Sequence, residues 1–74
     1  MRYTVLVSRE DDAYVVRVPR LPGCFSQGPT LDEALARAEE AVAGHVAALR
    51  DLGEPVPVED VPPIVATVEA EPAA

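Results

Sequence analysis

Two turn signals and a helix start lie close together in residues 21–34, and they constrain the fold more than any other part of the chain. Pro22-Gly23 indicates a turn because proline fixes φ and glycine permits positive φ, and Gly28-Pro29 soon repeats this signal. Thr30 follows as a helix N-cap, and Glu33 completes a capping-box pattern three residues later. The chain therefore changes here from short strands to a helix.

Before this stretch, apolar and polar residues alternate with a period of two, which is typical of β-strands. Residues 2–8 and 14–18 are rich in β-branched and aromatic residues, and the polar residues 9–13 join them as a hairpin. A third short strand is expected at 24–27, after the turn at Pro22-Gly23. Three strands joined by short turns predict an antiparallel meander.

After this stretch, the apolar period changes to about 3.6 residues, which predicts one amphipathic helix over residues 31–52. Gly53 supplies a C-terminal cap, and Pro55 and Pro57 prevent the helix from continuing. Alanines on the apolar stripe would keep the helix close to the sheet. The stripe comprises Leu31, Ala34, Leu35, Ala38, Ala41, Val42, His45, Val46, Leu49 and Leu52.

A fourth strand is predicted at Ile64-Val65-Ala66-Thr67-Val68, after a proline-punctuated linker from Glu54 to Pro63. A right-handed crossover would place it beside the first strand, which gives the sheet order 3-2-1-4. The expected fold class is therefore α+β, with the element order β-β-β-α-β. We expect one domain over residues 1–68 and a disordered acidic tail over residues 69–74.

Charge and cysteine content narrow the classes of partner. The 74 residues carry 13 acidic side chains and 6 basic ones, all of them arginine, so the net charge is −7. Nucleic-acid binding is not expected because it needs basic residues clustered on one face. A basic protein partner fits better, although acidity can also serve solubility alone. Self-association as a dimer or tetramer is expected, because so small a domain buries little surface and a single cysteine forms no internal disulfide.

Other features bear on compartment and cofactors. No apolar run approaches the ~20 residues of a membrane span, and no signal-peptide pattern opens the chain, so we expect a cytoplasmic protein without membrane contact. One cysteine and one histidine are too few for a structural zinc site, and no metal or cofactor is expected. Cys24 and His45 are interpreted as packing residues rather than as a nucleophile and its base.

Seven short motifs follow one another along residues 2–68: Tyr3-x-Val5, Asp11-Asp12, Val16-Arg17-Val18-Pro19, Leu21-Pro22-Gly23-Cys24, Ser26-Gln27-Gly28, Thr30-Leu31-Asp32-Glu33-Ala34 and Gly53-Glu54-Pro55-Val56-Pro57. In these motifs and their order the sequence resembles the HicB-like antitoxins of HicA/HicB toxin–antitoxin systems. The resemblance implies a partial RNase H-like fold that binds a small, basic, mRNA-cleaving HicA toxin and blocks its active site.

The chain departs from this family pattern in two places. Ala13 follows the acidic turn where the family commonly has glycine. Many family members also continue into a C-terminal helix-turn-helix or ribbon-helix-helix domain, which this sequence does not contain. Direct DNA binding is therefore not expected of this chain alone.

The likeness to RNase H raises an enzymatic alternative. Two-metal hydrolysis of this kind needs carboxylates from the first strand, the helix and the fourth strand. Residues 3–8 and 64–68 contain no carboxylate, so we expect no catalytic residue and no enzyme. A vestigial RNase H-like hydrolase nevertheless stays one alternative to the antitoxin. The other is a stand-alone oligomeric scaffold or regulatory module of the same fold without a toxin.

The candidate partner-binding residues are polar groups on the hairpin turn and near the helix start. They either contact a basic toxin surface or only solvate the turn and cap the helix. These candidates are Asp11, Asp12, Ser26, Gln27, Glu33, Arg37 and Glu40.

Overall fold

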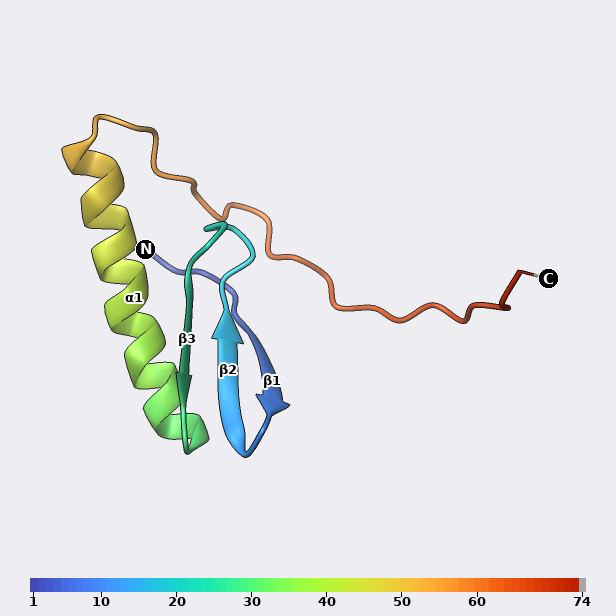
Figure 1. The fold of residues 1–74 in the computed structure, drawn as a ribbon. Coiled ribbons are helices and arrows are strands. Elements are labelled where there is room, and N and C mark those ends of the chain that lie inside the picture. The colour runs from blue at the N-terminus through green and yellow to red at the C-terminus, as the bar shows by residue number, and fades with distance from the viewer. Residues whose placement is uncertain (74) are drawn as a thin grey trace.

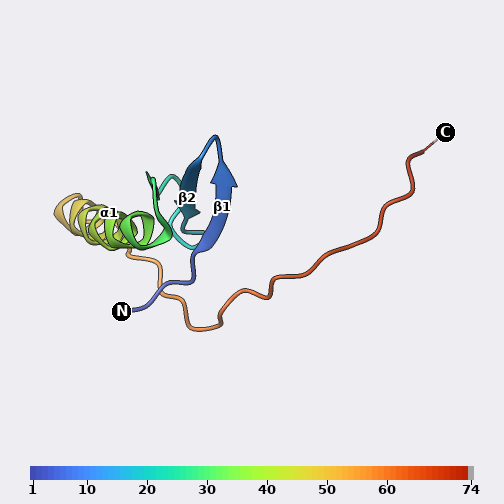
Figure 2. The same cartoon turned by 90° about the horizontal axis from the view of Figure 1, so that it is seen from below.

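The structure is a computed structural model and describes residues 1–73. Its elements are β1 (Leu6–Glu10), β2 (Ala13–Arg17), β3 (Phe25–Gly28) and α1 (Leu31–Asp51). Within the described residues the strands form one antiparallel sheet in the order β1-β2-β3 (Figure 1). Helix α1 packs against β3 and β2, so β1 is the edge strand farthest from the helix (Figure 2). The predicted meander followed by a helix is therefore confirmed.

The hairpin turn between β1 and β2 is shorter than the sequence suggested. Asp11 and Asp12 alone form it, with φ values of 48° and 63°. A two-residue turn with both φ values positive matches the twist of the strands, and aspartate tolerates this region better than most residues. Arg9, expected in the turn, lies opposite Tyr14 in the ladder, with its guanidinium carbon 5.4 Å from the ring centre. Strand β1 therefore begins and ends later than predicted.

The turn before β3 forms as expected from its proline and glycine. Gly23 has a φ of 83°, and the N–H of Cys24 donates to the carbonyl of Leu21 at 2.9 Å. This arrangement, with Pro22 and Gly23 at the two central positions, is a type II turn. It directs the chain from β2 into β3.

Both ends of α1 are capped by the residues that the sequence predicts, with the Thr30 half of the predicted capping box formed and the Glu33 carboxylate lying near Arg37 instead. The Thr30 hydroxyl accepts a hydrogen bond of 3.2 Å from the N–H of Glu33 at the N-terminus. At the other end Gly53 has a φ of 69°, and the N–H of Glu54 donates to the carbonyl of Leu49 at 2.9 Å. This bond belongs to a Schellman motif, which satisfies carbonyls in the last helical turn.

The core lies between the sheet and α1. Ala34 and Val16 are fully buried against each other near the start of the helix, with Ala38 beside them. Farther along α1, Val46 closes a second cluster with Val18, Leu21 and Cys24. The small side chains bring α1 so close to β3 that a Cβ atom on Gly28 would lie 2.8 Å from the nitrogen of Ala34.

The predicted fourth strand is not formed, which corrects the expected order 3-2-1-4. Residues 64–68 are extended, exposed and outside the sheet, and the chain leads away from the packed body (Figure 1). Pro62 and Pro63 precede this segment, and they have no N–H to donate to a neighbouring strand. The domain limit at residue 68 and the disorder of residues 69–74 stay predictions, and residue 74 lies outside the described residues.

Candidate functional site

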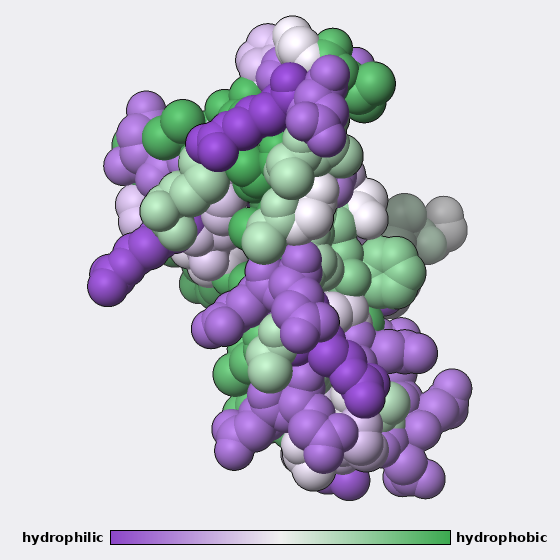
Figure 3. All heavy atoms as spheres, turned by 90° about the vertical axis from the view of Figure 1, so that its left-hand side faces the viewer, coloured by the Kyte–Doolittle hydropathy of each residue, from purple (hydrophilic) through white to green (hydrophobic). Residues whose placement is uncertain are grey.

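The hairpin tip and the start of α1 lie at the same end of the molecule and make that end acidic. Tyr14 pairs with Gly28, so β3 finishes beside the hairpin, and α1 begins three residues later. We call Asp11, Asp12, Asp32 and Glu33 the acidic end; all four are exposed. Figure 3 shows hydrophilic side chains gathered over this lower end of the helix side.

Three of the predicted site residues meet where β3 runs beside α1. The Arg37 guanidinium donates a 3.0 Å hydrogen bond to the carbonyl oxygen of Gln27. It also lies 4.0 Å from the Glu33 carboxylate, one helical turn earlier. Glu40 is exposed nearly one turn beyond Arg37. The structure therefore brings Gln27, Glu33 and Arg37 together, while the two hairpin aspartates lie at the tip.

Ser26 does not belong to this exposed set. Its side chain is buried, and its hydroxyl donates a 2.9 Å hydrogen bond to the carbonyl of Ala34. Ser26 therefore joins β3 to α1 inside the core, which corrects its inclusion among the residues that contact a partner. The sequence carries no signal for this, because a serine in a short strand is compatible with either face.

One acidic residue near the tip is paired with neighbouring side chains of the sheet. Glu10 accepts a 2.8 Å hydrogen bond from the Ser8 hydroxyl and lies 3.1 Å from the Arg17 guanidinium. The Ser8 hydrogen bond first, and then Arg17, lower the pKa of Glu10 below its ordinary value. The Glu10 carboxylate therefore interacts with side chains of its own sheet, whereas the Asp11 and Asp12 side chains are exposed to solvent.

The structure places Cys24 in the core and His45 on the helix. Cys24 is buried in the core beside Val46, and burial raises the pKa of its thiol, which disfavours the reactive thiolate. His45 is half-buried on α1. In residues 1–73, no three His, Cys, Asp or Glu side chains come together as a metal-binding group. The helix of this described part is also not long and apolar enough to cross a membrane.

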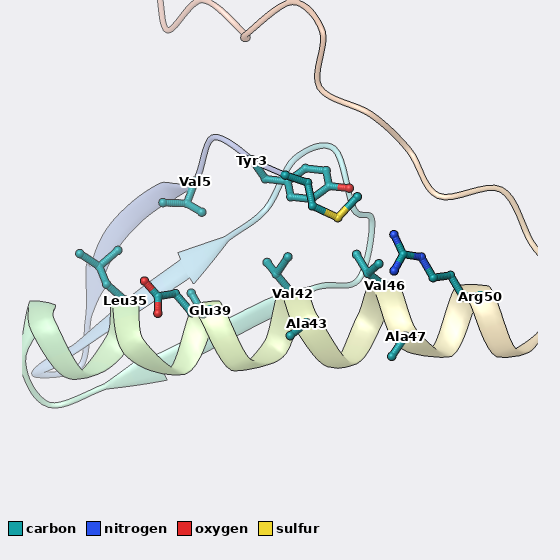
Figure 4. Close-up of a pocket in the computed structure, with 11 residues that line it drawn as sticks. Tyr3, Val5, Leu35, Glu39, Val42, Ala43, Val46, Ala47 and Arg50 are labelled. Atoms are coloured by element: carbon teal, nitrogen blue, oxygen red, sulfur yellow. The ribbon is translucent and has the colours of Figure 1, made fainter.

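An apolar groove runs along α1 on the side where the N-terminal residues cross it. Its volume is about 710 Å³. Val42 and Val46 of α1 face Tyr3 across the groove, and Val5 lines it nearer to Leu35 (Figure 4). Glu39 and Arg50 add one charge of each sign to the lining. This groove is not among the features predicted from the sequence. The apolar stripe of the helix is the signal for it, because the stripe is longer than the part of the helix that the small sheet covers.

A clasp between the two ends of the packed chain holds the N-terminal wall of this groove. The Tyr3 hydroxyl donates to the carbonyl of Pro57. The Thr4 N–H donates to the Glu59 carboxylate at 2.9 Å, and the Thr4 hydroxyl donates to it at 2.7 Å. The carboxylate thus binds two donors of one residue and fixes residues 3–5 beside the helix.

The chain is similar to proteins of archaea, bacteria and a phage. It is 45% identical over 58 residues to a UPF0150 protein of Thermoplasma acidophilum, a match that covers 77% of this chain and 84% of that protein. It is 42% identical over 57 residues to a 14.9 kDa protein from the rep-hol intergenic region of Haemophilus phage HP1, covering 77% of this chain but 43% of the phage protein. A UPF0150 protein of Synechocystis is 42% identical over 59 residues, which cover 78% of this chain and 75% of that protein.

A solved structure has the same fold. The N-terminal domain of the Burkholderia pseudomallei antitoxin HicB superposes with a TM-score of 0.66 at 42% sequence identity, covering 73% of this chain and 65% of that one. The model of the HicB-like antitoxins of bacterial toxin–antitoxin systems matches residues 3–73. This match includes the capped helix, the acidic hairpin and the clasp. The chain therefore belongs to the HicB-like antitoxin family.

Proposed function

We propose that this chain is an antitoxin that binds a small basic toxin of the HicA type and covers its mRNA-cleaving site without catalysing a reaction. The observation that carries the proposal is the match of residues 3–73 to the HicB-like antitoxin family. The likeness to the N-terminal domain of a HicB antitoxin supports it. The proposed place of action is the cytoplasm, because messenger RNA is the toxin's substrate there.

The acidic end is the part of the surface that we propose for the toxin contact. A toxin that binds RNA needs a basic surface, and a net charge of −7 on this chain complements it. Aspartates at the hairpin tip stand clear of any ion pair in the described residues, so their charge is free to attract a basic partner. The proposed contact residues are Asp11, Asp12, Gln27, Glu33, Arg37 and Glu40.

Co-expression with the small basic protein encoded beside this chain's gene tests the proposal. We expect relief of the growth arrest, a stable complex on size exclusion, and loss of RNA cleavage as the chain reaches equimolar amounts. The chain alone, with RNA and Mg²⁺, is expected to cleave nothing. Absence of a complex together with undiminished growth arrest would favour the stand-alone module instead, and metal-dependent cleavage by the chain would favour the hydrolase.

A matched pair of double variants tests the acidic end itself. Asp11→Asn with Asp12→Asn removes two charges while asparagine still tolerates the positive φ values of the turn. We expect association with the toxin to slow several-fold at low salt, and the difference to shrink above about 0.15 M salt as charges are screened. Asp51→Asn with Glu54→Gln makes the same charge change at the other end of α1 and should leave the rate nearly unchanged. Equal slowing by both pairs would mean that only net charge matters.

A further inference from the structure

The segment Ile64–Val68 has the composition of a strand but no partner within the described residues. Ile64 and Val68 are each 91% exposed, and Val65 is 75% exposed. Alternation would place Ile64, Ala66 and Val68 on one side of a strand, with Val65 and Thr67 on the other. A run of exposed β-branched residues leaves apolar surface in contact with water, and such runs are typical of segments that pair with another strand.

Strand β1 offers an edge that fits such a segment. In residues 1–73 it pairs only with β2, which leaves the backbone groups along its other side without a neighbouring strand. Leu6 and Val7 are 45% and 43% exposed. Val7 lies opposite the buried Val16 and therefore on the helix side of the sheet, next in the alternation after Val5 of the groove. A strand added to β1 would lie along the open side of the apolar groove.

The chain's own segment is poorly placed to fill this edge. The clasp holds Glu59 at Thr4, just before β1 begins. If the chain continued from there beside β1, Pro62 and Pro63 would occupy the middle of the edge, where they cannot donate hydrogen bonds. Ile64, five residues after Glu59, would then be level with Arg9, and the rest of the segment would pass the end of β1. In the structure the prolines instead direct the segment outward, away from its own sheet (Figure 2).

We propose that Ile64–Val68 of one copy adds to the β1 edge of a second copy, and that the exchange is reciprocal. Adding an extended segment to an exposed sheet edge is an established way for chains to associate, and a two-fold axis makes the same contact twice. Ile64, Ala66 and Val68 face the groove of the partner copy, and Val65 and Thr67 face outward. The central Ala66 then lies beside Val7 of the partner copy, which is on the same side of the sheet. The fourth strand that the sequence predicts beside β1 is then supplied by the other copy.

Light scattering on the full chain and two neighbouring variants tests this proposal. The chain is expected to be a dimer or a larger even oligomer. Ala66→Asp places a charge over the apolar groove and should weaken association at least about tenfold. Thr67→Asp makes the same addition on the outward side and should leave association nearly unchanged. Circular dichroism should show full helix in both variants, because residues 66 and 67 are exposed in the single chain. A monomeric parent chain, or oligomers equally insensitive to both variants, would overturn the proposal.

Disulfide trapping identifies which copy supplies the strand. In a Cys24→Ala background, Val7→Cys in one protein and Ala66→Cys in another should form a mixed disulfide dimer on oxidation. The double variant Val7→Cys with Ala66→Cys should give covalent dimers rather than internally linked monomers. Linked monomers would show that the segment turns back on its own sheet.

The two single variants, oxidised separately, provide the control. Each is expected to form few disulfide dimers with itself, because the exchange places residue 66 beside residue 7 and not beside its own counterpart. Efficient self-linking of the Ala66→Cys protein would show that two tails meet, and efficient self-linking of the Val7→Cys protein would show that two β1 edges meet. Either result contradicts the proposed exchange.

Discussion

The Ser26 hydroxyl donates a 2.9 Å hydrogen bond to the main-chain carbonyl of Ala34, and this bond joins β3 to the first turns of α1. Ser26 is only 9% exposed and Ala34 is fully buried, so the bond lies inside the core. The buried alanines beside it, Ala34 and Ala38, join the helix to the sheet through apolar contacts. Strand and helix are therefore held at a fixed, short separation in the region where the proposed toxin-contacting surface begins.

Removing this bond should weaken the fold measurably. The Ala34 carbonyl retains its helical partner in Ser26→Ala, so we expect a loss of about 1 kcal/mol in the free energy of unfolding rather than a larger penalty. Urea denaturation measures it. Ser8→Ala removes an exposed hydroxyl and should change stability by less than about 0.5 kcal/mol. Equal losses in the two variants would contradict the role given to Ser26.

Two glycine-to-alanine changes should have opposite signs. Gly28→Ala places a Cβ atom 2.8 Å from the Ala34 nitrogen, and backbone must shift to admit it, so we expect a loss of about 1–3 kcal/mol. Gly44→Ala meets nothing within 4 Å on the exposed side of α1 and should gain up to about 1 kcal/mol from helix propensity. Thermal unfolding of both proteins provides the comparison. Destabilisation by Gly44→Ala would be inconsistent with the helix face assigned to that residue.

Loss of the Glu59 carboxylate should open the clasp. In Glu59→Ala both Thr4 donors lose their partner, and because the site is partly exposed we expect about 1–2 kcal/mol of destabilisation. Amide exchange at Thr4 should accelerate as well. Asp60→Ala is the control, since its carboxylate makes only exposed contacts, a 3.0 Å hydrogen bond from the adjacent Val61 N–H and a 3.9 Å approach to Arg20, and should contribute little. Unchanged exchange at Thr4 would argue against the clasp.

Glu10 should titrate below its ordinary pKa. The Ser8 hydrogen bond and then Arg17 favour its charged form, so the folded-state pKa is lower than the unfolded one. Its contribution to stability is therefore fully present above the unfolded pKa and is lost as the pH falls through the folded value. NMR titration of the carboxyl group measures this directly. Ser8→Ala should raise the pKa of Glu10, whereas Ser26→Ala should not, because Ser26 lies on the other face of the sheet.

The Cys24 thiol should be protected in the folded chain. Burial raises its pKa, and its side chain is packed with Val18, Leu21 and Val46, so a thiol-reactive dye should label it slowly at neutral pH. Labelling should become fast in urea as the core opens. Gly28→Ala, by weakening the fold, should accelerate labelling under native conditions, whereas Gly44→Ala should not. Rapid labelling of the intact chain would contradict the core position of Cys24.

Local signals in the sequence account for the features that were predicted correctly. Thr30 and Gly53 cap the helix through hydrogen bonds between close neighbours, and Pro22-Gly23 determines its turn through its own backbone preferences. The hairpin was placed less well because a pair of aspartates at positive φ is a weaker signal than a glycine-containing turn. The strand alternation was nevertheless correct, since Val7 and Val16 lie opposite each other.

Features that depend on distant parts of the chain could not be read in this way. Ser26 is buried because α1 packs over β3, eight residues farther along the chain, and the N-terminal wall of the groove is held where Glu59 clasps Thr4, 55 residues away. Neither contact follows from the local signals of a turn or a helix cap. The fourth strand illustrates the same limit. Ile64–Val68 has strand-forming residues, but forming a strand also requires a neighbouring edge at a reachable position, which composition does not encode.

The clasp also bears on the order in which this protein assembles. Tyr3 and Thr4 are synthesised before their partners Pro57 and Glu59, which follow the whole helix more than fifty positions later. Closing so long a loop is slower than forming the hairpin or the helix, whose contacts are local. Tyr3 and Thr4 are therefore expected to reach their final contacts late in folding. Until they do, the newly made chain exposes the apolar side of its helix to chaperones or to other copies of the chain.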